Sequence, residues 1–205
     1  MATFNENSLK TSGWWFFKTI AFIYKIIFGV THPIVVKGRE NLPKQGAYVL
    51  VANHLSDSDP PAIGISVGPP VAFMAKEELF ERPIFGRTIA LLGAVSVDRE
   101  KPEPSTFKAI RKILKSGRPI LTFIEGTRSK HPGVLGLPHT GPAYLARSNK
   151  VPLVPVSITG SNDKTSKIYV TFGQPLEPSA DLDETTWRIM QTLSQMTGFK
   201  LPEKN

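Results

Sequence analysis

A histidine and an aspartate stand five positions apart, at His54 and Asp59, just after an apolar run at residues 47–51. We interpret the run as a buried strand, and reactive groups in α/β proteins commonly follow the carboxyl end of such a strand. Asp59 precedes Pro60, so we expect Asp59 to cap a helix that has this proline as its first residue. The loop between them can bring the Asp59 carboxylate to the His54 ring, where it would fix the tautomer and stabilise an imidazolium. This spacing permits a histidine general base, but on this segment alone a plain helix cap and a local hydrogen bond are the simpler interpretation.

Three further motifs follow or form other predicted strands. They are GAVSVDR at residues 93–99, FIEGTRS at residues 123–129 and VPLVPV at residues 151–156. Together with the segment from Asn53 to Asp59, they resemble the glycerolipid acyltransferases typified by 1-acylglycerol-3-phosphate acyltransferase. That family shows Asn-His-x-x-x-x-Asp, Gly-x-x-x-Val-Asp-Arg, Phe-x-Glu-Gly-Thr-Arg-Ser and Val-Pro-x-x-Pro-Val in this order. The resemblance covers about residues 35–175, and the order of the four motifs makes it specific.

The resemblance implies acyl transfer without a covalent enzyme intermediate. His54, oriented by Asp59, would take the proton of an acceptor hydroxyl while that hydroxyl attacks the thioester of an acyl-CoA or an acyl-carrier protein. The chain contains no cysteine, which fits direct transfer by a histidine base. The acyl donor is then a co-substrate, and we expect neither a separate cofactor nor a metal.

The resemblance also implies a binding site for the phosphate end of the acceptor. The expected substrate-binding residues are Asn53, Arg99, Glu125, Gly126, Thr127 and Arg128. A guanidinium presents a fork of N–H donors that suits phosphate, which favours the two arginines as its direct ligands. The expected acceptor is a lysophospholipid, foremost 1-acylglycerol-3-phosphate giving phosphatidate. Another lysophospholipid or polar lipid is the alternative.

Two positions depart from the family pattern. Ile124 stands where the family often has proline, which we interpret as a local backbone difference. His139 begins a His-Thr-Gly segment where many members have Lys-x-Gly. A lysine is charged at neutral pH and a histidine only part of the time, so this position bears on the identity of the acceptor headgroup.

Three other functions compete with an acyltransferase. Residues 64–68 match the Gly-x-Ser-x-Gly pattern of serine hydrolases around Ser66, but that elbow needs a strand before it, and here a helical pattern precedes it. A metal site at His54, Asp57 and Asp59 would lack further histidine or cysteine ligands nearby. A nucleic-acid-binding module would be expected to interleave aromatic and basic residues, and the basic segment does not do so. We therefore expect no nucleic-acid partner.

The composition fits one domain that meets negatively charged partners. The chain has 205 residues, of which 40% are hydrophobic and 20% charged, enough for one buried core and too apolar for a disordered chain. The 25 lysines and arginines exceed the 17 acids by eight. Residues 108–130 alone hold seven basic side chains and one acid. Of these we assign Arg128 to phosphate binding and the lysines of residues 108–115 to anionic headgroups or an acidic carrier protein.

Residues 1–31 differ in character from the rest of the chain. Eleven aromatic or isoleucine side chains crowd into residues 14–28, and Lys18 and Lys25 share one helical face. Tryptophan next to lysine is typical of a helix in the membrane interface, and two lysines disfavour a membrane-spanning helix. We expect an amphipathic aromatic helix that makes the protein peripheral or monotopic at the cytoplasmic face of an anionic membrane. A helix packed on the core is the alternative, and residues 32–205 would form the acyltransferase domain.

Short apolar runs alternate with helical patterns along the rest of the chain. The predicted strands cover residues 34–37, 47–51, 71–75, 94–97, 120–124, 153–158 and 168–172, and the predicted helices cover residues 60–67, 84–92, 106–116, 142–148 and 182–197. Ser105 is the expected N-cap of the basic helix, Phe107 lies on its apolar side, and Asp181 is the expected N-cap of the last helix. We predict a single α/β domain whose central sheet, mostly parallel or mixed, is flanked by helices.

Overall fold

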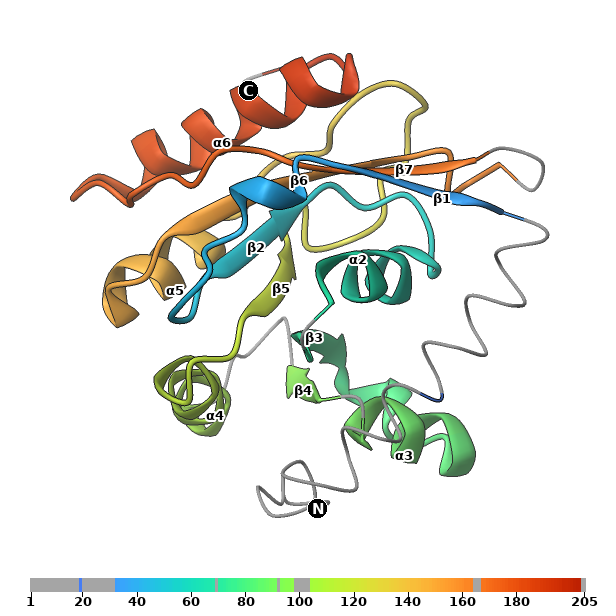
Figure 1. Cartoon of the computed structure of the whole chain (residues 1–205), viewed down its shortest axis with the longest axis vertical. Coiled ribbons are helices and arrows are strands. Elements are labelled where there is room, and N and C mark those ends of the chain that lie inside the picture. Colours follow the sequence, from blue (N-terminus) through green and yellow to red (C-terminus); the bar gives the residue numbers. More distant parts are fainter. Residues whose placement is uncertain are drawn as a thin grey trace.

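The apolar runs of the sequence form the strands of one seven-stranded sheet in the computed structural model (Figure 1). The structure describes residues 19, 32–68, 70–91, 93–97, 104–163 and 167–203, so the helix expected within residues 1–31 and the predicted ligand Arg99 lie outside the described residues. The strands are β1 (Ile34–Lys37), β2 (Val49–Ala52), β3 (Ala72–Lys76), β4 (Ala94–Val97), β5 (Ile120–Phe123), β6 (Leu153–Thr159) and β7 (Ile168–Phe172). All seven predicted strands are confirmed. Three have the predicted bounds, and the ends of the other four differ by two residues or less.

The strand order places the ends of three parallel strands next to one another. The order is β1-β7-β6-β2-β5-β3-β4, and only the pair β6–β7 is antiparallel among the pairs described. Ala52 at the end of β2 is in register with Phe123 of β5 on one side and Val156 of β6 on the other. The segments that follow β2 and β5 therefore leave the sheet side by side, at its carboxyl edge.

In the described ranges from residue 32 onward, five α-helices cover the sheet: α2 (Asp59–Val67), α3 (Pro83–Leu91), α4 (Pro104–Lys115), α5 (Gly141–Asn149) and α6 (Leu182–Thr197). Two short 3-10 turns, η2 (Arg39–Asn41) and η3 (Glu77–Leu79), complete the described elements. Figure 1 shows α4, α5 and α6 on one side of the sheet and α2 on the other. None of the described helices is both long enough and apolar enough to span a bilayer.

The central strand β2 contributes to a hydrophobic core on each face of the sheet. Val49 and Val51 pack in the core that includes side chains of α4, α5 and α6, whereas Leu50 and Ala52 pack in the core that includes α2. All four side chains are fully buried. Burying a valine or leucine side chain is worth about 1.5–3 kcal/mol. The sheet is thus held from both faces directly below its carboxyl edge, as the unbroken apolar run predicted.

Three expectations about helices α2 and α4 are wrong. Helix α2 begins at Asp59 itself, with Ser58 as its N-cap, and the Asp59 carboxylate bonds to the preceding loop instead of capping the helix. Ser105 lies inside the first turn of α4, which begins at Pro104. Phe107 is not part of the buried side of α4: it is 40% exposed, and its ring meets Tyr144 of α5.

The cap of the last helix is confirmed. The Asp181 side chain accepts hydrogen bonds from the backbone N–H groups of Asp183 and Glu184, two of the donors that a helix N-terminus leaves unpaired. Gly198 then ends α6 in the left-handed conformation. This well-capped helix closes one face of the sheet through Ile189 and Leu193.

Candidate active site

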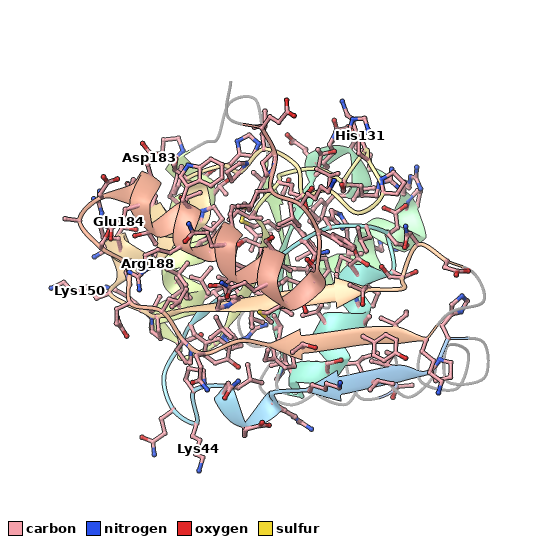
Figure 2. All side chains as sticks on the ribbon, turned by 90° about the horizontal axis from the view of Figure 1, so that it is seen from above. Lys44, His131, Lys150, Asp183, Glu184 and Arg188 are labelled. Atoms are coloured by element: carbon pink, nitrogen blue, oxygen red, sulfur yellow. The ribbon has the colours of Figure 1, made fainter. Side chains whose placement is uncertain are left out.

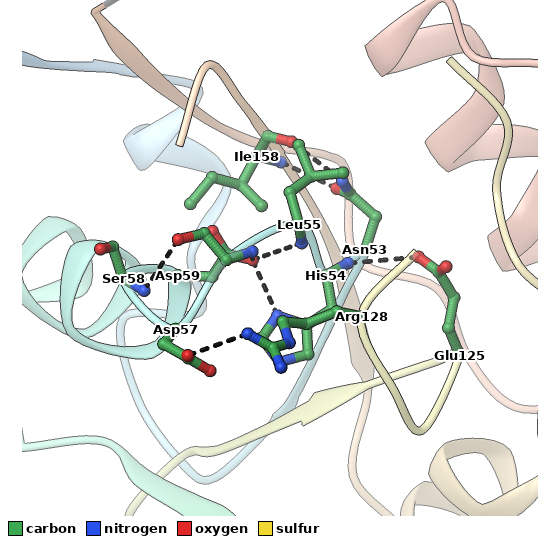
Figure 3. A network of polar contacts seen from close by, with 10 residues as sticks. Asn53, His54, Leu55, Asp57, Ser58, Asp59, Glu125, Arg128 and Ile158 are labelled. Atoms are coloured by element: carbon green, nitrogen blue, oxygen red, sulfur yellow. Dashed lines mark hydrogen bonds and ion pairs between the residues drawn. The ribbon is translucent and has the colours of Figure 1, made fainter. Parts of the chain in front are cut away.

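The His54 ring and the Asp59 carboxylate meet at the carboxyl edge of the sheet (Figure 3). His54 follows β2, Asp59 begins α2, and His54 Nδ1 lies 2.8 Å from Asp59 Oδ2. The same Oδ2 atom accepts the backbone N–H groups of Leu55 at 2.6 Å and Ser56 at 2.8 Å. Asp59 is fully buried and its charge lies at the N-terminus of α2, where the helix dipole favours an anion. A carboxylate on Nδ1 places the proton there and leaves the lone pair on Nε2.

The His54 residue is held on three further sides. Its backbone N–H donates to Glu125 Oε1 at 3.2 Å, and its backbone carbonyl accepts from the Ser129 N–H at 2.7 Å. Its ring stacks on Phe123, with centroids 3.9 Å apart and planes 18° apart. Phe123 ends β5, and the other two residues belong to the loop that follows it. The loop after β5 therefore fixes the position of the histidine that follows β2.

Glu125 uses both carboxylate oxygens on backbone N–H groups. Oε1 accepts from His54, and Oε2 accepts from Gly136 at 2.8 Å. Burial raises the pKa of Glu125 above its ordinary value, and the hydrogen bonds from Gly136 and His54 oppose that rise. A Cβ atom at position 136 would come within 2.6 Å of Oε2, so the side chain requires a glycine there. Glu125 thus holds the backbone of His54 and of Gly136 in place.

Asn53 likewise bonds to backbone. Its Nδ2 donates to the Ile158 carbonyl at 2.9 Å and its Oδ1 accepts from the Ile158 N–H at 2.8 Å. The residue has no exposed surface. The Asn53 side chain therefore ties the end of β2 to β6.

The remaining motif residues lie on the solvent side of the site. Gly126 adopts φ +64°, and a Cβ atom there would come within 2.9 Å of the His139 ring. Thr127 and Arg128 are exposed. Arg128 Nη1 pairs with Asp57 Oδ2 at 2.9 Å, with 57% and 86% of the two side chains exposed. The loop thus presents a guanidinium and an imidazole to solvent, next to the His54–Asp59 pair.

The hydrolase alternative has no support in this geometry. Ser66 is in the last turns of α2, almost fully buried, and its hydroxyl donates to the Ala62 carbonyl at 2.7 Å. A nucleophile elbow would instead expose this oxygen between a strand and a helix. Within the described ranges, no group of three or more His, Cys, Asp or Glu side chains is arranged to hold a metal.

The partners of these residues were not predicted. Phe123 opens a motif, but its position below the histidine depends on the register of β2 and β5. Gly136 lies eleven residues beyond Glu125, and Ile158 lies 105 residues beyond Asn53. The sequence offers no spacing rule for either contact, whereas His139 stands out as a departure from the family pattern.

Comparisons with known proteins agree on one family. The acyltransferase family model matches residues 33–159. A 1-acyl-sn-glycerol-3-phosphate acyltransferase of Bacillus subtilis is 31% identical over 78% of this chain and 82% of its own length, and one of Streptococcus pneumoniae is 30% identical over 87% and 70%. The crystal structure of PlsC, the 1-acyl-sn-glycerophosphate acyltransferase of Thermotoga maritima, has a TM-score of 0.78 and 25% identity, covering 92% of this chain and 81% of that one. The family that the four motifs resemble is confirmed, and the chain belongs to the acyltransferases.

Proposed function

We propose that this protein transfers a fatty acyl group from a thioester donor to the free hydroxyl of 1-acylglycerol-3-phosphate, with His54 as general base and Asp59 as its orienting carboxylate. The observation that carries the proposal is the 2.8 Å contact between Asp59 Oδ2 and His54 Nδ1 beside an exposed arginine. The acceptor is taken from the relatives, which are named for acyl transfer to 1-acyl-sn-glycerol-3-phosphate.

In the proposed reaction the acceptor hydroxyl gives its proton to His54 Nε2 while its oxygen attacks the thioester carbonyl carbon. The C–O bond forms, the tetrahedral intermediate collapses, and the C–S bond breaks. The imidazolium then returns the proton to the departing thiolate. Asp59 stabilises the imidazolium because three N–H donors hold its Oδ2 in place. No enzyme side chain is acylated, in keeping with the absence of cysteine.

The phosphate of the acceptor is expected at Arg128. In the structure Arg128 pairs with Asp57, and both side chains are mostly exposed. An exposed ion pair of this kind contributes about 0–1 kcal/mol, so a phosphate that offers bidentate, doubly charged contacts can displace Asp57. Arg99 is the second expected ligand, and Thr127 and His139 lie on or against the same loop.

We also propose that the protein works at the cytoplasmic face of a membrane, as a peripheral or monotopic protein. The support is the aromatic segment between residues 14 and 28 with Lys18 and Lys25, together with an excess of eight positive charges. An amphipathic acceptor resides in a bilayer, and a basic protein with interfacial tryptophans is attracted to anionic headgroups.

A matrix of donors and acceptors tests the proposal. Purified full-length protein is incubated with acyl-CoA or acyl-carrier protein and with lysophosphatidate, other lysophospholipids or neutral lipid alcohols, and products are identified by mass. We expect phosphatidate from lysophosphatidate. In the same assay His54→Ala and Asp59→Asn should each lower kcat about 10²- to 10⁴-fold, and circular dichroism should confirm that both variants fold.

Ser66→Ala is the matched control, because Ser66 bonds only to its own helix in the contacts described. It should keep most of the activity. An inactive Ser66→Ala protein beside an active His54→Ala protein would overturn the mechanism and restore the hydrolase alternative. If another lysophospholipid gives a product and lysophosphatidate gives none, the proposed acceptor is wrong and the proposed His54 mechanism still stands.

A further inference from the structure

A basic pocket lies between the last turns of α4 and α5, away from the candidate active site. It has a volume of about 310 Å³, and its lining includes the cations Arg111, Lys115 and Lys150 and the polar residues Ser148 and Asn149. None of the described residues that line it is acidic. Pockets of this size bind small molecules, and three cations with two neutral hydrogen-bonding side chains suit phosphate groups.

The pocket is at the amino edge of the sheet, opposite the His54 edge. Helix α4 ends just before β5 and α5 ends just before β6, so both helices point their C-termini to the edge where these strands begin. Figure 2 shows Lys150 on the opposite side of the molecule from His131, which belongs to the loop after β5. Val49 is in register with the first residues of β5 and β6, and His54 lies five residues beyond Val49. At about 3.3 Å per residue, His54 therefore lies at least roughly 17 Å along the strands from the pocket, whose lining residue Val151 precedes the first residue of β6.

An exposed aromatic pair lies between the pocket and the catalytic edge. Phe107 of α4 and Tyr144 of α5 meet edge to face with centroids 5.9 Å apart, and their exposed fractions are 40% and 44%. Each stands four residues before a pocket residue on the same helix, Arg111 and Ser148, and therefore on the same helical face one turn closer to the carboxyl edge. A ligand anchored in the pocket thus has an apolar surface beside it on the way to His54.

Lys150 occupies a backbone position that favours glycine. Its φ is +54°, and it is the one non-glycine residue with positive φ among the described residues. It follows the end of α5 and donates its N–H to the carbonyls of Ala146 and Arg147. Glycine is the usual residue at such a helix end because it has no Cβ penalty. A lysine kept in this conformation at the rim of a basic pocket points to a function for its ammonium group.

We propose that this pocket binds the phosphates of the coenzyme A part of an acyl-CoA donor, with the pantetheine arm passing Phe107 and Tyr144 toward His54. The proposal rests on the proposed acyl-transfer function. The arm has about as many bonds as four extended residues, roughly 14 Å, so it covers most of the distance from the pocket to the histidine, and the diphosphate and the acyl thioester at its two ends cover the rest. A pocket is concave and small, which favours a nucleotide over the broad acidic surface of a carrier protein.

Equilibrium binding without any acceptor lipid tests the proposal. CoA and pantetheine, which lacks the phosphates, are titrated calorimetrically into the full-length protein and into Lys150→Gly, Arg111→Gln and Lys108→Gln. Removal of one cation from the pocket should raise the Kd for CoA about tenfold in Lys150→Gly and Arg111→Gln. Lys108 is on the same helix outside the pocket, so Lys108→Gln should leave the Kd unchanged. Pantetheine binding should be equal in all four proteins.

Lys150→Gly separates binding from folding, since glycine fits φ +54° and should leave Tm unchanged or higher. Holo-acyl-carrier protein and phosphatidylglycerol vesicles are titrated in parallel. Three results would each overturn the proposal: an unaltered Kd for CoA in both pocket variants, an equal loss of CoA binding in Lys108→Gln, or a loss of binding by the pocket variants that is confined to the carrier protein or to the vesicles. Binding is measured without lysophosphatidate. A wrong acceptor would therefore change the product in the transfer assay and leave these Kd values as expected.

Discussion

Arg128 and Asp57 form an exposed ion pair whose two members have different expected roles. The guanidinium is the expected phosphate ligand, and the carboxylate pairs with it in the structure. Asp57→Asn should therefore lower KM for lysophosphatidate, by about two- to fivefold, because an exposed pair is worth about 0–1 kcal/mol. Arg128→Gln should raise the same KM at least tenfold with a smaller effect on kcat, since it removes charge-assisted hydrogen bonds to phosphate. Steady-state kinetics with varied acceptor measures both, and an unchanged KM in Arg128→Gln would place the phosphate elsewhere.

Glu125 is buried beside two N–H donors, and burial raises its pKa. Between the pKa of the unfolded chain and this raised value, the folded protein binds more protons than the unfolded chain. The contribution of Glu125 to the free energy of unfolding is therefore largest at acidic pH and falls as pH rises through the folded pKa. The glutamine in Glu125→Gln does not titrate. The free energy of unfolding of this variant minus that of the parent should therefore increase with pH.

Urea unfolding at a series of pH values from about 4 to 8 checks this sign, which follows from linkage. Glu177→Gln, at an exposed glutamate, controls for the loss of one negative charge. A difference between Glu125→Gln and the parent that stays constant with pH, or that falls, would contradict the expected raised pKa.

At the scale of secondary-structure elements, a side chain at the end of one strand holds the neighbouring strand. Asn53 pairs with both backbone groups of Ile158, and this joins the segment that carries His54 to β6. Asn53→Ala should lower the free energy of unfolding by about 1–3 kcal/mol for each buried group left unpaired. It should also lower kcat, because the start of the catalytic loop loses its tie. Denaturant unfolding and the transfer assay measure the two effects, and a stable variant with a raised acceptor KM would instead favour a substrate contact for Asn53.

The elements themselves could be predicted from the sequence because strands buried on both faces appear as unbroken apolar runs. The hydrogen bonds of the site residues could not. An aspartate before a proline is typical of a helix cap, but the loop before Asp59 turns its own N–H groups toward the carboxylate. Motifs identified Asn53 and Glu125 as important, yet their partners are backbone groups at Ile158 and Gly136, which only the folded chain brings near.

At the scale of the whole molecule, positive charge is present at both edges of the sheet. Arg128 lies at the carboxyl edge beside His54, and Arg111, Lys115 and Lys150 lie at the amino edge. The sequence showed a basic segment at residues 108–130 but not that the fold places Arg111 and Lys115 at one edge of the sheet and Arg128 at the other. Lys150, twenty residues beyond that segment, joins the amino-edge group only through the packing of α5.

Deletion of residues 1–31 tests the predicted membrane attachment. These residues hold the crowded aromatic side chains with Lys18 and Lys25. The shortened protein should no longer sediment with vesicles that contain phosphatidylglycerol, since it loses the interfacial apolar area and its accompanying charge. It should keep the circular dichroism of the folded domain, because the described residues from 32 onward include all seven strands. Undiminished binding to vesicles would indicate that the basic surface of the domain suffices.

The pairing of β1 with β7 has a consequence for folding. Ile34 pairs with Ile168, so the strand nearest the start of the described domain finds its partner 134 residues later. Closing so long a loop carries an entropic cost that is recovered only after the intervening strands have formed. During synthesis on the ribosome, β1 therefore cannot pair with β7 until nearly the whole domain has emerged. As an edge strand with one partner in the described sheet, it is also the strand from which the native structure should begin to open.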